Sequence, residues 1–227
     1  MTTSKSVTLG YVHGGTSAAY GIRPEFVTSL LSVVLDEKAG DLVGQVVQAS
    51  CGALVAVARN MLTAQFLASD SEWLWQVDTD MAFGPQTLLG LHSVANPYHR
   101  PIVSALCHIL DDRQGVMPSV YQAMADDGDD TGLQFERLKT VPPGRLLRVA
   151  AAGAACLLVH RSAFEKIRAD QGDQPVWWNH VTSGPVMMGE DLSFCMRAGA
   201  AGVPVYVHAG VQAGHVKPVM IGDVTGQ

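Results

Sequence analysis

Strand-like and helix-like segments alternate along the first half of this chain, and that alternation restricts the fold more than any single motif does. The expected strands cover residues 7–13, 41–49, 73–77 and 101–108, and the expected helices cover residues 24–35, 54–69 and 85–94. Strands that alternate with helices of this length form βαβ units. We therefore predict an α/β protein with a mostly parallel central sheet sandwiched by helices.

The second half is less regular. Residues 111–144 are polar and rich in turn-forming residues, one or two strands are expected within 145–160, and a further strand is expected at 203–208. Short helices are expected at 161–169 and from about 190 to 201. No internal repeat or low-complexity linker divides the chain. We expect one domain over residues 1–227, with a nucleotide-type half at 1–110 and a more irregular half at 111–227.

The composition narrows the possible partners. Hydrophobic residues make up 48% of the chain and charged residues 16%, which is enough for a large core. The formal net charge of -6 does not resemble the basic footprint of a nucleic-acid binder. We expect a small-molecule ligand, and an anionic one would require local positive charge or a metal ion.

The sequence also suggests a compartment. No segment has the length and apolar character of a signal peptide or a membrane span. The cysteines form no CxxC pair, and each has apolar neighbours: Cys51, Cys107, Cys156 and Cys195. We interpret them as buried free thiols in a reducing compartment, which predicts a cytoplasmic protein.

An apolar strand, WLWQV, runs directly into Asp78-Thr79-Asp80. Ligands of parallel sheets lie beyond the carboxyl ends of the strands, and residues i and i+2 of an extended segment point the same way. Asp78 and Asp80 would then face one site, where their repulsion favours a cation. Oxygen ligands suit Mg²⁺ or Mn²⁺. The alternative is a polar turn in which an aspartate caps the next helix.

Three further positions are candidates for chemistry. Glu190 and Asp191 open a helix, and capping together with the helix dipole is enough to explain why one carboxylate stands there. The apolar neighbourhood, which includes Met187 and Met188, would raise the pKa of the other carboxylate toward that of a base. Arg59 lies within an apolar helix, so it either pairs with an anionic ligand or extends to solvent. His215 ends a small strand-like element and is either a structural residue or a ligand.

The order of these pieces resembles that of a GT-A fold glycosyltransferase of the family 2 type. The shared pattern is a hydrophobic strand into D-x-D, then GED opening a helix, then AGVP and a closing Gly-His, and it spans nearly the whole chain. The resemblance implies a nucleotide-sugar donor, most simply a UDP- or GDP-sugar, and a divalent cation, Mn²⁺ or Mg²⁺. The acceptor would be a glycan, a protein or a lipid-linked sugar, and the oligomeric state stays open.

The resemblance also implies roles for individual residues. On the donor side it implies that Asp80, Asp78 and His215 bind the metal ion and that Arg59 and Lys217 contact the diphosphate. Asp78 would also contact the ribose. The nucleobase would lie against a loop formed by Tyr11, Val12 and His13. On the acceptor side it implies Asp191 as the general base of an inverting enzyme, Glu190 as an orienting residue, and Gly153, Ala154 and Ala155 beside the donor sugar. Trp177 and Trp178 would form an apolar platform for an acceptor sugar.

The chain departs from the family pattern near its start. Many members carry Pro-x-[Tyr/Phe]-[Asn/Asp] where this sequence has Tyr11-Val12-His13-Gly14, which weakens the nucleobase assignment. The long membrane-associated extension of processive synthases is not present, so we expect a non-processive enzyme. Three alternatives stay open: a retaining transferase with the same metal site, a sugar nucleotidyltransferase, and a glycan-binding protein without activity. The second would favour a basic glycine-rich first loop, and no Lys or Arg occurs between residues 6 and 22.

Overall fold

The structure is a computed structural model. It describes residues 5–14, 21–50, 52, 54–111, 113–124, 135–171, 176–183 and 186–217. Cys51 lies outside these residues, whereas Cys107, Cys156 and Cys195 are buried free thiols, as the sequence predicted.

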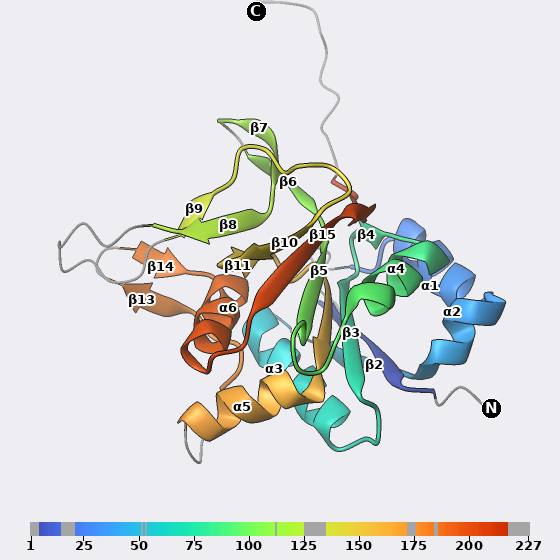
Figure 1. Cartoon of the computed structure of the whole chain (residues 1–227). Helices are drawn as coiled ribbons and strands as arrows, with labels where there is room; N and C mark the ends of the chain where they lie inside the picture. Colours follow the sequence, from blue (N-terminus) through green and yellow to red (C-terminus); the bar gives the residue numbers. More distant parts are fainter. Residues whose placement is uncertain are drawn as a thin grey trace, which may run out of the picture.

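A seven-stranded sheet forms the centre of the molecule (Figure 1). Its strands, in spatial order, are β10 (Leu146–Val149), β15 (Val205–Gln212), β5 (Ile102–Leu106), β12 (Cys156–His160), β3 (Trp73–Asp78), β1 (Val7–His13) and β2 (Val43–Ser50). Five of them, β2, β1, β3, β5 and β15, run in one direction, and β12 and β10 run against them. The predicted mostly parallel sheet is therefore confirmed, with one antiparallel strand inserted between β3 and β5.

Helices cover both faces of the sheet (Figure 1). On one face lie α3 (Val55–Leu67), α5 (Arg161–Gln171) and α6 (Glu190–Ala200), which share a core cluster containing Leu62, Phe164 and Phe194. On the other lie α1 (Pro24–Leu35), α2 (Glu37–Leu42) and α4 (Pro85–Val94), around a second cluster. Strand β3 contributes side chains to both clusters, which explains why its sequence is apolar without alternation.

Three sequence predictions need correction here. The strand expected from residue 41 begins at Val43, because residues 37–42 form α2 instead. The Asp36 carboxylate caps that helix by accepting hydrogen bonds from the backbone N–H groups of Lys38 and Ala39. The turn-rich part of the second half holds strands that were not expected: β7 (Gly115–Pro118), β8 (Val120–Ala123) and β9 (Phe135–Arg137), with β6 (His108–Asp111) leading into it. Residues 145–160 hold three strands rather than one or two, because β11 (Ala151–Ala152) lies between β10 and β12.

The remaining short strands form two separate pairs. Strands β13 (Val181–Ser183) and β14 (Val186–Met188) pair just before α6. Strand β16 (Gly214–His215) pairs antiparallel with β4 (Met81–Ala82), which directly follows the turn after β3. The last described part of the chain is thereby held against the carboxyl end of β3.

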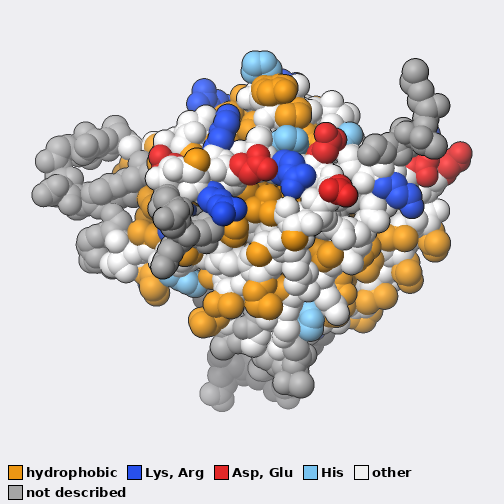
Figure 2. Space-filling view, turned by 90° about the horizontal axis from the view of Figure 1, so that it is seen from below, with side chains coloured by type: hydrophobic (Ala, Val, Ile, Leu, Met, Phe, Trp, Pro, Cys, Tyr) orange, Lys and Arg blue, Asp and Glu red, His pale blue; other side chains and the backbone are white. Residues whose placement is uncertain are grey.

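The opposite end of the molecule, where β3 begins, carries mixed charges. Seen from below, Lys and Arg side chains are interspersed there with Asp, Glu and His (Figure 2). The described side chains on that face do not gather into a basic patch. None of the described helices is both long enough and apolar enough to cross a membrane.

Candidate active site

Asp78 and Asp80 lie at the carboxyl end of β3 but face different partners. Asp78 is the last residue of the strand, and Thr79 and Asp80 form a turn. The backbone therefore changes direction between the two carboxylates, which have different hydrogen-bond partners, although the charge of Asp80 still acts on Asp78. Asp78 faces Arg59, whereas Asp80 faces the C-terminal segment. Each carboxylate thus meets its own positive partner, which relieves their repulsion.

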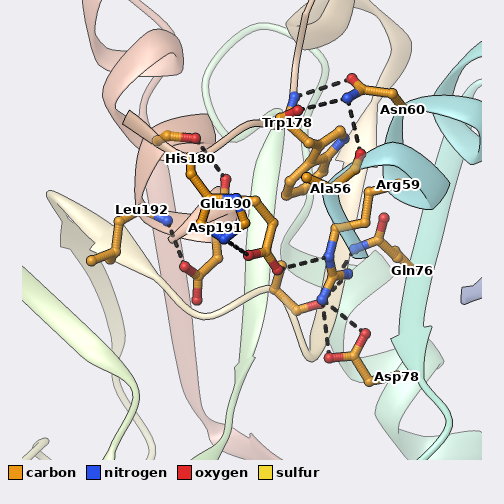
Figure 3. Close-up of polar contacts among 12 residues, drawn as sticks. Ala56, Arg59, Asn60, Gln76, Asp78, Trp178, His180, Glu190, Asp191 and Leu192 are labelled. Atoms are coloured by element: carbon orange, nitrogen blue, oxygen red, sulfur yellow. Dashed lines mark hydrogen bonds and ion pairs between the residues drawn. The ribbon is translucent and has the colours of Figure 1, made fainter. Parts of the chain in front are cut away.

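Arg59 is a buried link between distant parts of the sequence. Its Nη2 lies 2.9 Å from Asp78 Oδ1, and its Nε lies 3.2 Å from Glu190 Oε1 (Figure 3). The guanidinium also sits over the Trp178 ring, 5.5 Å from its centroid. Burial opposes the charged form, but the two carboxylates outweigh it and raise the pKa of Arg59. With 3% of its surface exposed, Arg59 is not placed to bind a diphosphate, and this prediction is corrected.

Asn60 holds the segment that precedes the second acidic motif. Its Oδ1 accepts hydrogen bonds from the backbone N–H groups of Trp177 and Trp178, each at 3.1 Å, and its Nδ2 donates to Trp178 O. The two indoles point into the core, where Trp178 stacks on Phe194 with a centroid distance of 4.1 Å. Both indole N–H groups are hydrogen bonded inside the protein. The predicted sugar platform is therefore wrong for these two side chains, because they form part of the core.

Glu190 and Asp191 open α6 as predicted, and they have different surroundings. Glu190 is bound to Arg59, while Asp191 lies apart from Arg59 and accepts a hydrogen bond at 2.8 Å from Leu192 N (Figure 3). Burial raises the pKa of Asp191, and the nearby Glu190 carboxylate adds to the rise. Met188 is buried but Met187 is exposed, so the expected shielding by Met187 is not seen. Burial also raises the pKa of Asp78, which is paired with Arg59, and the role of Asp191 as a base stays a prediction.

Gly153 allows Ser119 to approach the backbone closely, and Asp191 lies next to this contact. A methyl group built on Gly153 would lie 3.7 Å from Asp191 Oδ2 and 2.4 Å from Ser119 Oγ. The neighbouring carbonyl, Ala154 O, accepts a hydrogen bond from Gln76 Nε2 at 3.4 Å. The small residues of this turn thus lie near Gln76 and Asp191, and their place beside a donor sugar stays a prediction.

Asp80 and His215 meet, although 135 positions separate them. His215 Nε2 and Lys217 Nζ lie 2.9 and 2.7 Å from the same oxygen, Asp80 Oδ2. The pairing of β16 with β4 and the bond from Val216 N to Asp80 O hold this segment in place. Burial would raise the pKa of Asp80, but the bonds from His215 and Lys217 lower it to about 2.

The His215 ring is oriented as metal-binding histidines often are. Its Nδ1 lies 2.9 Å from the carbonyl oxygen of His108, so Nδ1–H donates to that oxygen and Nε2 is directed to Asp80. In metal sites, a hydrogen bond from the other ring nitrogen to a carbonyl oxygen fixes the orientation of a ligating histidine. Among the described residues, however, no three His, Cys, Asp or Glu side chains are close enough to hold a metal ion together. Asp80 and His215 fit a cation as a pair, and Asp78 is bound to Arg59 instead.

The end of β1 lies beside this site, as predicted. Val12 is level with Asp78 in the register of β1 and β3, and its carbonyl oxygen accepts a hydrogen bond from the Thr79 hydroxyl. The Tyr11 hydroxyl donates to Gln48 Oε1 at 2.7 Å, and the Tyr11 and His13 rings lie 6.3 Å apart. The position of these residues agrees with a nucleobase loop, and their role stays a prediction.

Two residues of the site escaped the sequence analysis. His180 Nε2 lies 3.9 Å from Glu190 Oε2, and no sequence pattern had singled it out. Gln76 is buried next to Arg59, and its Oε1 has no hydrogen-bond partner among the described residues (Figure 3). A polar residue within the apolar run WLWQV was a usable signal for Gln76. His180 gave no signal, because its partner is ten positions away.

Asp191→Asn should stabilise the protein near neutral pH. Folding raises the pKa of Asp191, because burial favours the neutral carboxyl group. The stability that Asp191 contributes is therefore complete below the ordinary aspartate pKa, and it is lost as the pH rises through the pKa of the folded protein. Asparagine carries no charge and can still accept the hydrogen bond from Leu192 N. The stability advantage of the variant should therefore vanish below about pH 4. Urea unfolding between pH 3.5 and 7.5 measures it, and a variant less stable than wild type at pH 7 would contradict the expectation.

Comparison with known proteins identifies the fold. The chain matches no family model and no curated protein. Many solved structures are similar to it, and two of these match most of the chain. A197 from STIV has a TM-score of 0.57 and 17% identity, covering 93% of this chain and 86% of that one. GalNAc-T7, solved with UDP, GalNAc and Mn²⁺, has a TM-score of 0.59 and 12% identity, covering 94% of this chain and 44% of that one. The GT-A type fold is confirmed, and membership of family 2 stays a prediction.

Proposed function

We propose that this protein is a metal-dependent glycosyltransferase that moves a sugar from a nucleotide-diphosphate-sugar to an acceptor hydroxyl. The observation that carries the proposal is the meeting of Asp80 and His215 at the carboxyl end of β3. That end of the sheet is where α/β proteins bind ligands. The similar GalNAc-T7 structure contains UDP, GalNAc and Mn²⁺, which supports a nucleotide-sugar and a divalent cation for this fold.

The donor would bind through residues 1–110 together with the C-terminal segment. Asp80 and His215 would hold Mn²⁺ or Mg²⁺, and the cation would neutralise the charge that develops on the nucleoside diphosphate as it leaves. Tyr11, Val12 and His13 would border the nucleobase, and Lys217 lies near enough to Asp80 to approach the phosphates. A UDP- or GDP-sugar is the donor class that we propose.

The acceptor would bind through residues 111–227. An acceptor hydroxyl is a weak nucleophile near neutral pH, so a carboxylate that receives its proton lowers the barrier. Asp191 is proposed for this role, because its raised pKa suits a base and it opens α6 beside Glu190. Glu190, held by Arg59, would orient the donor or the acceptor. The reaction would then invert the anomeric carbon.

A retaining reaction is the second candidate on the same site. The observation that favours it is the hydrogen bond from Leu192 N to Asp191 Oδ1, which occupies one oxygen of the proposed base. In that case Asp191 would position groups, and Asp191→Asn would lose part of the activity rather than nearly all of it. The anomeric configuration of the product, determined by NMR, distinguishes the two reactions.

A thermal-shift screen of UDP-, GDP- and TDP-sugars, with and without Mn²⁺, tests the proposal. A donor at about 100 times its Kd stabilises the fold by about 2.7 kcal/mol, which corresponds to a rise in Tm of about 5–10 °C for a chain of this size. The rise should require both the nucleotide-sugar and Mn²⁺ and should disappear with EDTA. Binding to glycans without any nucleotide-sugar binding would contradict the proposal and favour a glycan-binding protein.

A further inference from the structure

Lys217 occupies the place beside Asp80 that a cation would take. Its Nζ lies 2.7 Å from Asp80 Oδ2, and His215 Nε2 lies 2.9 Å from the same oxygen. The carboxylate is already neutralised by side chains of the protein itself. The Lys217 side chain is 41% exposed, so water is available to the ammonium if it leaves this position.

These two contacts would compete with a divalent ion bound to the same atoms. An ion held by Asp80 Oδ2 and His215 Nε2 would bring further positive charge to the oxygen that the ammonium contacts at 2.7 Å, and the two cations would repel each other. The imidazole nitrogen would give up its proton to solvent when it binds the ion. We propose that Lys217 is a resident counter-ion of Asp80 which a divalent cation must displace. This inference rests on the metal site of the proposed function and adds an exchange step to it.

The backbone would stay in place during the exchange. Val216 N donates to Asp80 O at 2.8 Å, and β16 is paired with β4, so the chain on the N-terminal side of Lys217 is fixed to the turn after β3. Rotation about the flexible lysine stem is enough to move the ammonium away. The freed ammonium would remain near the site, where an anionic donor brought in with the cation could accept its hydrogen bonds.

Amine labelling of the native full chain tests the exchange directly. The protein is treated briefly with an acylating reagent, with and without saturating Mg²⁺, and modification of Lys217 is compared with that of Lys166 by mass spectrometry. Lys166 is exposed on α5, away from Asp80, and serves as the internal reference. We expect Mg²⁺ to increase the relative labelling of Lys217 severalfold. In Asp80→Asn the labelling should be high without Mg²⁺ and should not respond to it.

Mg²⁺ affinity gives a second, independent measurement. Removing the competing ammonium in Lys217→Met should tighten Mg²⁺ binding about two- to fivefold, the range expected for loss of one partly exposed ion pair. Lys217→Arg keeps a cation beside Asp80 and should bind Mg²⁺ no more tightly than wild type. Lys166→Met, which makes the same change in net charge at a distance, should leave the affinity unchanged.

The outcomes separate this inference from the proposed function. Unchanged labelling of Lys217 while Mg²⁺ binds, or weaker Mg²⁺ binding by Lys217→Met, overturns the exchange and leaves the transferase proposal intact. No Mg²⁺ binding by any variant overturns both the exchange and the proposed metal site. A confirmed exchange without nucleotide-sugar binding leaves a cation site and overturns the transferase proposal alone.

Discussion

Arg59→Met should lower the free energy of unfolding by about 3 kcal/mol, because it leaves Asp78 and Glu190 facing each other without a positive charge between them. The Asp78 and Glu190 side chains are 29% and 17% exposed, so water offsets only part of the loss. Methionine fills a similar volume and keeps the apolar contact with Trp178. Urea unfolding at neutral pH, with the slope compared to wild type, measures the change.

Two further variants separate the charge effect from packing. Arg168→Met removes the same charge from the exposed surface of α5 and should change the free energy of unfolding by less than about 0.5 kcal/mol. Adding Asp78→Asn and Glu190→Gln to Arg59→Met removes the uncompensated carboxylates and should recover much of the lost stability. If Arg59→Met lowers the free energy of unfolding no more than Arg168→Met does, the ion pairs of Arg59 with Asp78 and Glu190 contribute little to stability.

Asp80→Asn should reduce sugar-transfer activity about a thousandfold and abolish the dependence on Mn²⁺. Loss of a metal ligand removes several kcal/mol of stabilisation of the leaving diphosphate, and each 1.36 kcal/mol is a factor of ten in rate. Asparagine also removes the charge that attracts His215 and Lys217. Initial rates with a Mn²⁺ titration, together with Mn²⁺ affinity measured without substrate, give both parts of the prediction.

Asp70→Asn is the matched control for this experiment. Asp70 is exposed just before the start of β3, at the other end of the strand from Asp80, and its replacement makes the same change in charge. It should leave the activity and the Mn²⁺ response within about twofold of wild type. Full activity of Asp80→Asn in the presence of EDTA would refute a metal-dependent mechanism through this residue.

The acidic motifs could be placed from the sequence because they follow from local rules. An apolar run of strand length that ends in Asp78-Thr79-Asp80 has one natural position, at the carboxyl end of a buried strand, and β3 ends there. Gly189 before Glu190 and Asp191 marks a helix start, and α6 begins at Glu190. The meeting of Asp80 and His215 was expected only through the resemblance to GT-A enzymes. The likeness to GalNAc-T7 supports that fold without testing the roles of the residues.

The partners of the side chains were less predictable. Arg59 and the two tryptophans are residue types that occur both in ligand sites and in cores, and the sequence does not state which face of a helix or loop meets solvent. Arg59 was expected on a diphosphate and is bound to Asp78 and Glu190, while Trp177 and Trp178 were expected on a sugar and are buried. The common reason is that burial depends on elements far away in the sequence, here α5 and α6.

The sequence by itself predicted the main strands and helices of the first half, the acidic end of β3 and the start of α6, because periodicity and end signals act over a few residues. It did not predict α2 or most of the short strands. Only the tertiary structure decided which charges pair. It placed Arg59 of α3 between carboxylates 19 and 131 positions away, and it laid His215 and Lys217 against Asp80 through the pairing of β16 with β4. Electrostatic partners are selected by distances of about 3 Å in space, and the folded sheet sets those distances.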